Sequence, residues 1–220
     1  MIFKDMASVN EALAKNEIIE FSEKTLILAS GSASRFKIMG NANLKFVVIP
    51  SRINEEKLKG EFGKIKTESD AEEYVKMLSY AKAEWLKPRV KNAVILAADT
   101  VAFYKNEILE KPKNEKDARR IFSTLSNSTH IAITGVCIID GEKINNFAKI
   151  SPVKMLDIPD SLQDILVKDK LTYTYAGGYC VDGNLGDKVV LDKADFNNVM
   201  GLPIEDIMKI FEEEGYDFSK

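Results

Sequence analysis

The sequence has only two cysteines and one histidine among its 220 residues, and this scarcity excludes several kinds of site. Cys137 and Cys180 are far apart and form no CxxC pair, so we expect two reduced core residues and neither a disulfide nor a metal pair. A single histidine, His130, cannot make a histidine metal site. We expect it to be a hydrogen-bonded structural residue.

Long apolar runs and an excess of positive charge are also missing. No apolar run approaches transmembrane length, and residues 1–22 contain acids that a signal peptide would not, so we expect a cytoplasmic protein without a membrane segment. The formal charge of −3 argues against a nucleic acid polymer or an anionic membrane as the partner. The GxxxxGK[ST] and GxGxxG motifs are absent, which removes the key residues of P-loop and Rossmann sites.

What is present is an alternation of strand and helix patterns, which predicts a mixed α/β fold. The length allows one large domain or two small lobes. Residues 1–22 are expected to form an appended N-terminal helix, and residues 23–220 the domain itself. The expected strands cover 24–29, 44–49, 94–98, 131–140, 143–156, 179–181 and 188–191, with a β-like segment at 101–110. The expected helices begin near Phe36, cover 69–87, 114–125 and 161–168, and begin again near Pro203.

The first apolar strand ends abruptly in small hydroxyl residues, a glycine and an arginine. A strand that turns into a helix here leaves free backbone N–H groups at the helix N-terminus, which favours an anion such as phosphate. Ser30, Ser32 and Ser34 can donate hydroxyl hydrogen bonds there, and Arg35 can form a two-pronged pair with phosphate oxygens. An ordinary turn with a capping serine is the alternative.

Asp99 follows the apolar run of residues 94–98, and a carboxylate at the end of a buried strand is a common place for ligand and metal sites. A turn or capping aspartate is the alternative. Lys111 precedes Pro112, which holds its backbone extended and gives its ammonium a fixed starting point. A solvated turn would explain the same pair of residues.

Glu55 and Glu56 follow the second expected strand and could supply a second carboxylate. Mg²⁺ usually takes one or two protein carboxylates together with waters and substrate phosphates. Surface charge on a helix is the alternative, and the pattern does not decide between the two glutamates. Lys82 lies beside core-facing alanines in the helix of residues 69–87, where a snorkelling surface lysine is the bland interpretation.

Taken in order, these segments resemble the Maf family of nucleoside triphosphate pyrophosphatases. The matching motifs are Leu28-Ala-Ser-Gly-Ser32, Ala98-Asp-Thr100, Lys111-Pro112, Leu125 to Val136, Ala176 to Tyr179, and Val199-Met-Gly-Leu-Pro203. The resemblance covers about Thr25 to Phe211. Each motif is weak alone, whereas six in order with family-like spacing are specific.

The resemblance implies an α/β fold with a mixed twisted sheet and flanking helices, in two lobes around a long cleft. It implies hydrolysis of a nucleoside triphosphate to the monophosphate and pyrophosphate, clearing non-standard or surplus nucleotides. A divalent metal, Mg²⁺ or Mn²⁺, and a homodimer are also expected. The alternative is a non-hydrolysing nucleotide-binding regulator of cell division or septum formation.

The resemblance also assigns roles to individual residues. Asp99 matches the catalytic aspartate and, with Glu55, would hold the metal. The phosphate-binding residues would be Ser30, Ser32, Arg35, Lys82 and Lys111.

Two departures from the family pattern affect the substrate more than the chemistry. Ser34 stands where most members have the first arginine of Ser-Pro-Arg-Arg, and Asp182 replaces the glutamine of Tyr-Gly-Ile-Gln-Gly. We assign both positions, with Thr100, to substrate specificity. Asp182 is expected to favour a base that presents N–H donors, as guanine does. Thr174-Tyr175 also replaces the usual Asp-Lys before Ala-Gly.

Overall fold

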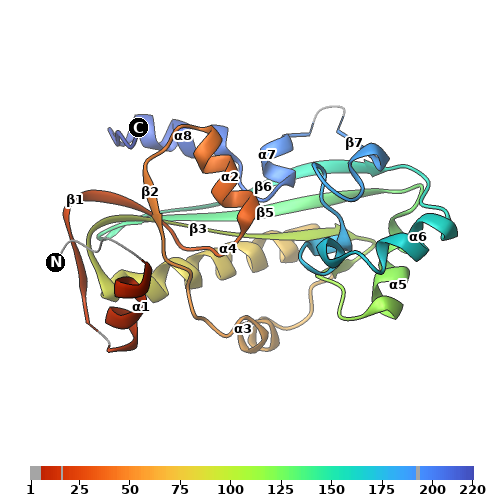
Figure 1. Ribbon diagram of the computed structural model, residues 1–220, viewed down its shortest axis with the longest axis horizontal. Coiled ribbons are helices and arrows are strands. Elements are labelled where there is room, and N and C mark those ends of the chain that lie inside the picture. Colours follow the sequence, from red (N-terminus) through yellow and green to blue (C-terminus); the bar gives the residue numbers. More distant parts are fainter. Residues whose placement is uncertain (1–5, 16, 192–193) are drawn as a thin grey trace.

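The computed structural model describes residues 6–15, 17–191 and 194–220, which form one mixed sheet flanked by helices (Figure 1). The strands are β1 (Ile19–Leu28), β2 (Phe46–Val48), β3 (Val90–Tyr104), β4 (Glu107–Leu109), β5 (Thr129–Asp140), β6 (Lys143–Met155) and β7 (Val189–Val190). Their order is β2-β1-β3-β5-β6-β7, with β4 also beside β3. β1 runs parallel to β2 and β3, and the remaining pairs are antiparallel. The expected mixed α/β fold is confirmed.

Helices cover both faces of this sheet. They are α1 (Met6–Ala14), α2 (Ala33–Asn41), α3 (Glu55–Phe62), α4 (Glu68–Leu86), α5 (Glu115–Leu125), α6 (Asp160–Leu166), α7 (Phe196–Val199) and α8 (Ile204–Glu213). Short 3-10 turns lie at η1 (Lys87–Arg89), η2 (Lys170–Tyr173), η3 (Ala176–Gly178) and η4 (Gly186–Lys188). Side-chain caps fix several helix starts, including Ser32, Asn54, Asn114 and the Thr67/Asp70 capping box of α4. None of the helices described is both long and apolar enough to cross a membrane.

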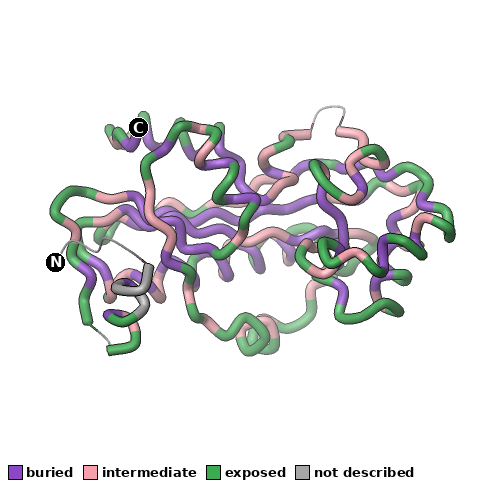
Figure 2. Tube along the Cα trace, in the orientation of Figure 1, coloured by how far each residue is buried: buried purple, intermediate pink, exposed green. Residues whose placement is uncertain are grey.

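The central strands are largely buried (Figure 2). The buried side chains form two clusters on each face of the sheet. On one face of β3, Ala98 belongs to the cluster that contains α2 and α8, whereas Ala102 belongs to the cluster around α5 and α6. On the other face, Ala97 packs in the cluster with α1, and Val101 packs under the first half of α4. Two lobes therefore meet where β3 passes residues 98–101.

β3 has a gap between its partners at this same point. β1 ends with Leu28 opposite Leu96, and Leu109, the last residue of the antiparallel β4, lies opposite Ala102 on the same edge. β5 meanwhile pairs with β3 without interruption along the other edge. Residues 97–101 thus form a notch, which we define as the stretch of the β3 edge between the last residue of β1 and the last residue of β4.

The structure corrects several predicted element boundaries. The strand expected to end at residue 98 continues to Tyr104, so Asp99 lies within β3 and not at its end, because β5 supplies an unbroken partner. β1 begins at Ile19, so the segment 1–22, expected to be only an appended helix, includes the first residues of the sheet. The strand expected at 179–181 is absent: residues 179–180 are irregular and lead into a turn at 181–185, and the N–H of Cys180 donates to the side chain of Asn184.

Other predictions are confirmed. The hairpin between β5 and β6 turns at Gly141, which has a positive φ of 58°. Asn114 caps α5 as expected. The last helix begins one residue after Pro203, which is its N-cap residue. The short helix α7 was not predicted.

Candidate functional site

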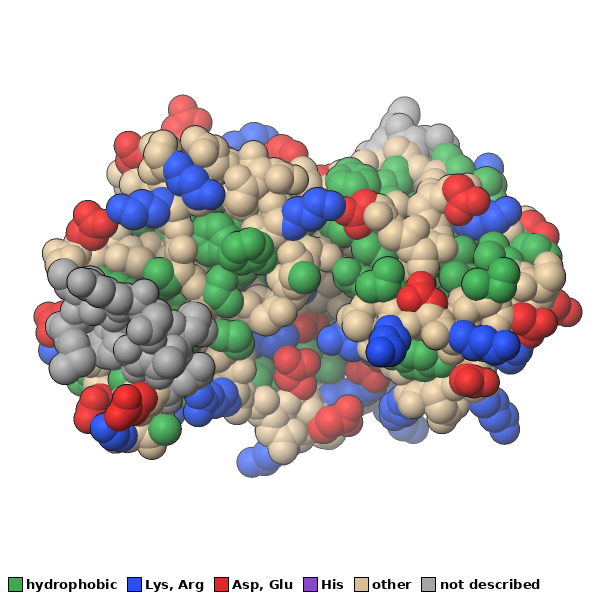
Figure 3. Space-filling view, viewed as in Figure 1, with side chains coloured by type: hydrophobic (Ala, Val, Ile, Leu, Met, Phe, Trp, Pro, Cys, Tyr) green, Lys and Arg blue, Asp and Glu red, His purple; other side chains and the backbone are tan. Residues whose placement is uncertain are grey.

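The notch opens into a cavity of about 920 Å³ that is lined by both lobes. Figure 3 shows it as a hollow near the middle of the molecule, where acidic and basic side chains gather. The residues expected to act on phosphate or metal all line it: Ser30, Ser32, Arg35, Glu55, Lys82, Asp99 and Lys111. The structure therefore brings together side chains that are up to 81 positions apart in the chain, as between Ser30 and Lys111.

Lys82 lies between two carboxylates on one face of β3. Its Nζ is 2.5 Å from Asp99 Oδ1 and 3.0 Å from Glu55 Oε1. The lysine side chain is only 9% exposed and that of Asp99 13%, so this ion pair is largely shielded from solvent. The interpretation of Lys82 as a snorkelling surface lysine is therefore wrong, since α4 turns it towards the sheet.

The close approach of α4 depends on a glycine in the neighbouring strand. Gly135 of β5 lies directly opposite Asp99. A Cβ at this position would overlap the backbone carbonyl of Val75 in α4. The missing side chain lets the helix backbone rest on the sheet, and this brings Lys82 within reach of Asp99.

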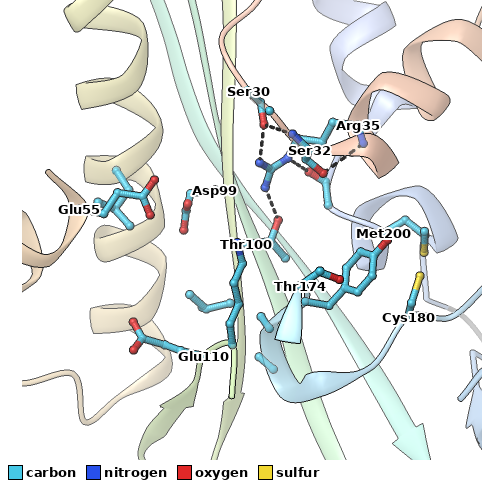
Figure 4. Close-up of a pocket in the computed structure, with 18 of the residues that line it drawn as sticks. Ser30, Ser32, Arg35, Glu55, Asp99, Thr100, Glu110, Thr174, Cys180 and Met200 are labelled. Atoms are coloured by element: carbon cyan, nitrogen blue, oxygen red, sulfur yellow. Dashed lines mark hydrogen bonds between the residues drawn. The ribbon is translucent and has the colours of Figure 1, made fainter. Parts of the chain in front are cut away.

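Glu55 is the first residue of α3, which lies across the cavity from Asp99 (Figure 4). Glu56 also lines the cavity, and Glu55 is the one that pairs with Lys82, so the choice of Glu55 as the site acid stays a prediction that this contact favours. A second ion pair, from Lys59 to Glu110 at 2.6 Å, connects α3 to the segment after β4. No residue of α3 is fully buried, and the helix packs on the core only through the partly buried Leu58 and Phe62.

Arg35 lies on the opposite face of β3 and is buried. Its Nε donates to the carbonyl of Gly201 at 2.7 Å, and its two terminal nitrogens donate to Ser30 Oγ and Thr100 Oγ1, each at 3.0 Å. Burial lowers the pKa of the guanidinium, and the charges of Asp99 and Glu55 oppose that shift. Three of the five N–H groups are thus used within the protein.

The two serines before α2 support this arginine as well as the helix. Ser32 caps α2 by accepting from the backbone N–H of Arg35, and Ser30 Oγ accepts from the backbone N–H of Ser32. The sequence offers a capping serine and a phosphate site as alternatives. The observed turn is compatible with both roles, because the serines cap α2 and also line the cavity. Each hydroxyl oxygen is an acceptor within the protein, and each retains a hydroxyl hydrogen that can be donated.

Ser34 and Asp182 are not among the residues that line the cavity: Ser34 is buried, and Asp182 lies at the surface beside Lys37. Ser34 Oγ donates to Tyr175 Oη at 3.3 Å. Asp182 accepts from Lys37 Nζ at 2.6 Å and from Cys180 Sγ at 3.1 Å, and these bonds, the one from Lys37 above all, hold the pKa of its carboxyl below the usual range. Tyr175 and Cys180 do line the cavity. A role of Ser34 and Asp182 in specificity stays a prediction. In this geometry the two residues would act on a bound base indirectly, through the positions of the Tyr175 and Cys180 side chains.

Thr100, the third residue assigned to specificity, lines the cavity, and its hydroxyl oxygen accepts a hydrogen bond from Arg35. Lys111 lies exposed at the rim, after Glu110. Pro112 behind it is buried, and a Cβ at Gly178 would lie 3.1 Å from its ring. The fixed starting point that the proline would give the Lys111 ammonium stays a prediction.

Several lining residues had no signal in the sequence that set them apart. In the sequence, Tyr74 lies on the apolar face of α4 and cannot be distinguished from a core residue. In the structure it lines the cavity, and burial and the charges of Glu110 and Asp99 raise the pKa of its hydroxyl. Glu110 precedes the Lys-Pro pair, which is the one clue to its place. Cys180 was expected in the core and is indeed buried, but it also borders the cavity.

Comparison with known proteins agrees with this arrangement. A family model described as Maf-like protein matches residues 25–214. A protein of Pyrococcus furiosus named dTTP/UTP pyrophosphatase is 36% identical over 86% of this chain and 95% of its own length. Proteins with the same name from Acholeplasma laidlawii and Thermococcus kodakarensis are 34% and 33% identical, over 84% and 87% of this chain and 93% and 97% of theirs. The six motifs, the two-lobed fold around a charged cavity and these matches lead to one conclusion: the chain belongs to the family of Maf-like proteins.

Proposed function

We propose that this protein hydrolyses a nucleoside triphosphate to the monophosphate and pyrophosphate. The observation that carries the proposal is the convergence of Arg35, Lys82 and Lys111 with Asp99 and Glu55 in one cavity. A triphosphate concentrates negative charge, which cationic groups stabilise most strongly in a partly desolvated site. Relatives named dTTP/UTP pyrophosphatase support the same substrate class.

The side chains divide the reaction between positioning and proton transfer. Arg35 and Lys111 would bind the phosphates from the two lobes, and the serine hydroxyls before α2 would donate to phosphate oxygens. Asp99 would accept the proton of the water that attacks the α-phosphorus. Lys82, 2.5 Å from Asp99, would orient that carboxylate and offset charge on the phosphates.

The carboxylates also fit a divalent cation that is completed by the substrate. Among the residues described, no group of three or more His, Cys, Asp or Glu could hold a metal. Asp99 and Glu55 supply two hard oxygen donors, which is what Mg²⁺ or Mn²⁺ takes when waters and phosphates fill the other positions. Such a cation would neutralise phosphate charge and polarise the phosphoryl oxygens.

A pyrophosphate-release screen tests the proposal directly. Standard and modified nucleoside triphosphates are supplied with and without Mg²⁺ or Mn²⁺, and we expect release from at least one of them that needs the metal. Nucleotide binding without any pyrophosphate release would contradict hydrolysis and favour the alternative, a nucleotide-binding regulator.

Replacing Asp99 tests the assignment of the proton acceptor. Asp99→Asn keeps the shape of the side chain and removes its basicity, so we expect kcat to fall by roughly 10²-fold or more. Asp164→Asn is the matched control, because Asp164 pairs with Arg119 on the outer surface of α6. Near-wild-type turnover by Asp99→Asn in the presence of metal would overturn the assignment.

A further inference from the structure

A closed ring of hydrogen bonds surrounds the guanidinium of Arg35. Arg35 donates to Thr100 Oγ1, which lies 3.0 Å from Thr134 Oγ1 in the next strand. Thr134 in turn donates to the carbonyl of Asn198 at 3.0 Å. The N–H of Gly201 donates to that same carbonyl, and the carbonyl of Gly201 accepts from Arg35 Nε, which closes the ring.

Counting donors fixes the direction of every bond in the ring. A hydroxyl has one hydrogen to donate. Thr134 uses its hydrogen on Asn198, so in the bond between the two threonines Thr100 must be the donor. Thr100 then has only acceptor capacity left for Arg35, which agrees with the N–H that points at it. The chain of donors therefore runs one way, from Arg35 through both threonines to the Asn198 carbonyl.

The surroundings leave this ring little room to rearrange. Thr134 and Asn198 are completely buried, so a lost bond would not be replaced by one to bulk water. Gly201 has a φ of 107°, and a Cβ there would meet Thr100 Oγ1 and Arg35 Nε at 3.3 and 3.5 Å. The preceding residue, Met200, lines the cavity, so the turn of residues 198–201 that takes part in the ring is also part of the cavity wall.

We propose that Thr134 is a positioning residue for Arg35: through Thr100 and the Asn198–Gly201 turn, it fixes the plane of the guanidinium that faces the polyphosphate. The inference rests on the proposed function, because it assigns Arg35 to the phosphates. Thr134 lies one layer behind the cavity lining and touches no part of the substrate itself.

The test replaces the hydroxyl of Thr134 while keeping its shape. Thr134→Val removes the hydrogen that holds the Asn198 carbonyl, and Thr134→Ser restores it. We expect Thr134→Val to weaken binding of inorganic tripolyphosphate, measured by calorimetry, by roughly 3- to 10-fold, the effect of one lost hydrogen bond. The kcat/KM for the nucleotide found in the screen should fall by the same factor, and Thr134→Ser should stay near wild type.

Two further variants separate positioning from a general loss of stability. Ser79→Ala also removes a completely buried hydroxyl, one that bonds within α4 and to Asn146, and it should lower the melting temperature without changing tripolyphosphate affinity. In an Arg35→Lys background, which lacks the planar fork, Thr134→Val should have little additional effect.

The proposal fails if Thr134→Val binds tripolyphosphate as the wild type does, if Thr134→Ser is equally impaired, or if the losses from Arg35→Lys and Thr134→Val simply add. Failure of the proposed function is a different result: the wild-type protein would release no pyrophosphate, while the tripolyphosphate measurements would still decide the role of Thr134.

Discussion

Asp99 and Thr100 are neighbours in the sequence, and the alternation of the strand sends them to opposite faces of the sheet (Figure 4). Asp99 meets Lys82 on the α4 face, whereas Thr100 meets Arg35 on the face covered by α2. One stretch of backbone therefore connects the Asp99–Lys82 ion pair to Arg35. A one-residue slip in the pairing of β3 would exchange the two contacts.

Individual residues were predictable where they broke a local pattern. Asp99 interrupts an apolar run, and Arg35 follows a serine-rich turn, so both stood out without a structure. Their partners could not be predicted in the same way, because Lys82 and Thr100 come to them from other elements. The contact that Asp182 makes with Lys37 likewise depends on tertiary packing, and nothing local indicates it.

The buried His130 predicts a dependence of stability on pH. Its Nε2 is 2.7 Å from Tyr179 Oη, and burial lowers its pKa to about 4 from an ordinary value of 6.5. Between these values the unfolded chain binds more protons than the folded one, so stability falls as the pH falls. The loss is at most on the order of 3 kcal/mol.

Urea unfolding at pH 7 and at pH 4.5 measures this effect. The wild type should lose more stability between the two conditions than His130→Gln, which has no group that titrates there. Carboxylates that are ion-paired in the folded state contribute equally to both proteins and cancel in the comparison. Equal losses in the two proteins would show that His130 is not held neutral by burial.

At the scale of elements, the long helices α4 and α5 were predicted well, whereas the short capped helices α3 and α7 and the polar half of β3 were not. Asn114 marks the start of α5, and the apolar period of α4 predicted its course within one residue at either end. The sequence predicts a strand that ends at residue 98, because the polar Asp99 and Thr100 follow an apolar run; β3 in fact continues to Tyr104. What actually ends there is β1, and the cavity lies beyond its carboxyl end.

The contact between α4 and the sheet predicts a sensitive position at Gly135. Gly135→Ala forces the new methyl group against the backbone of α4, which cannot move as a side chain can. We expect a loss of about 1–3 kcal/mol in the free energy of unfolding, measured by urea denaturation. Lys82 should also move away from Asp99, so turnover should fall even at temperatures where the variant is folded.

Gly40→Ala is the matched control, because a Cβ at that helix position meets nothing within 4 Å. It should leave both stability and turnover near or above the wild-type values. If Gly135→Ala were as stable and as active as this control, the close packing of α4 on β5 would not be needed to place Lys82.

For the molecule as a whole, the two lobes share one continuous sheet, and different helices pack on that sheet in each lobe. β3, β5 and β6 extend through both lobes, and the apolar clusters change where β3 passes the cavity. The alternation of elements predicted the fold class, but neither the division of the core nor the notch could be predicted. Both follow from where β1 ends relative to β4, and that is fixed by pairing between distant segments.

This arrangement predicts where the protein responds to a ligand. α3 has no fully buried residue and is held by the ion pairs of Glu55 and Lys59 and by the contact of the Phe62 ring with Tyr74. Its amides should exchange with solvent much faster than those of β3 in the free protein, because exposed ion pairs contribute little stability. Hydrogen exchange followed by mass spectrometry measures both segments.

On addition of tripolyphosphate, we expect new protection in α3 and no change in α8, whose exchange serves as the internal reference. Slow exchange of α3 in the free protein, equal to that of β3, would contradict this expectation. So would ligand-induced protection that is the same in α3 and α8.

The notch also determines what kind of atoms the wall of the cavity presents. The carbonyl of Leu96 accepts from the N–H of Ala29 on the β1 side, and alternate residues of a strand turn their peptide groups the same way. The N–H and C=O of Thr100, which lines the cavity, therefore face the opening between β1 and β4. No amino-acid replacement other than proline removes a peptide donor, so this strip of wall stays chemically constant in every variant that keeps the strand. Changes in which base is accepted are then left to the segments that surround the strip.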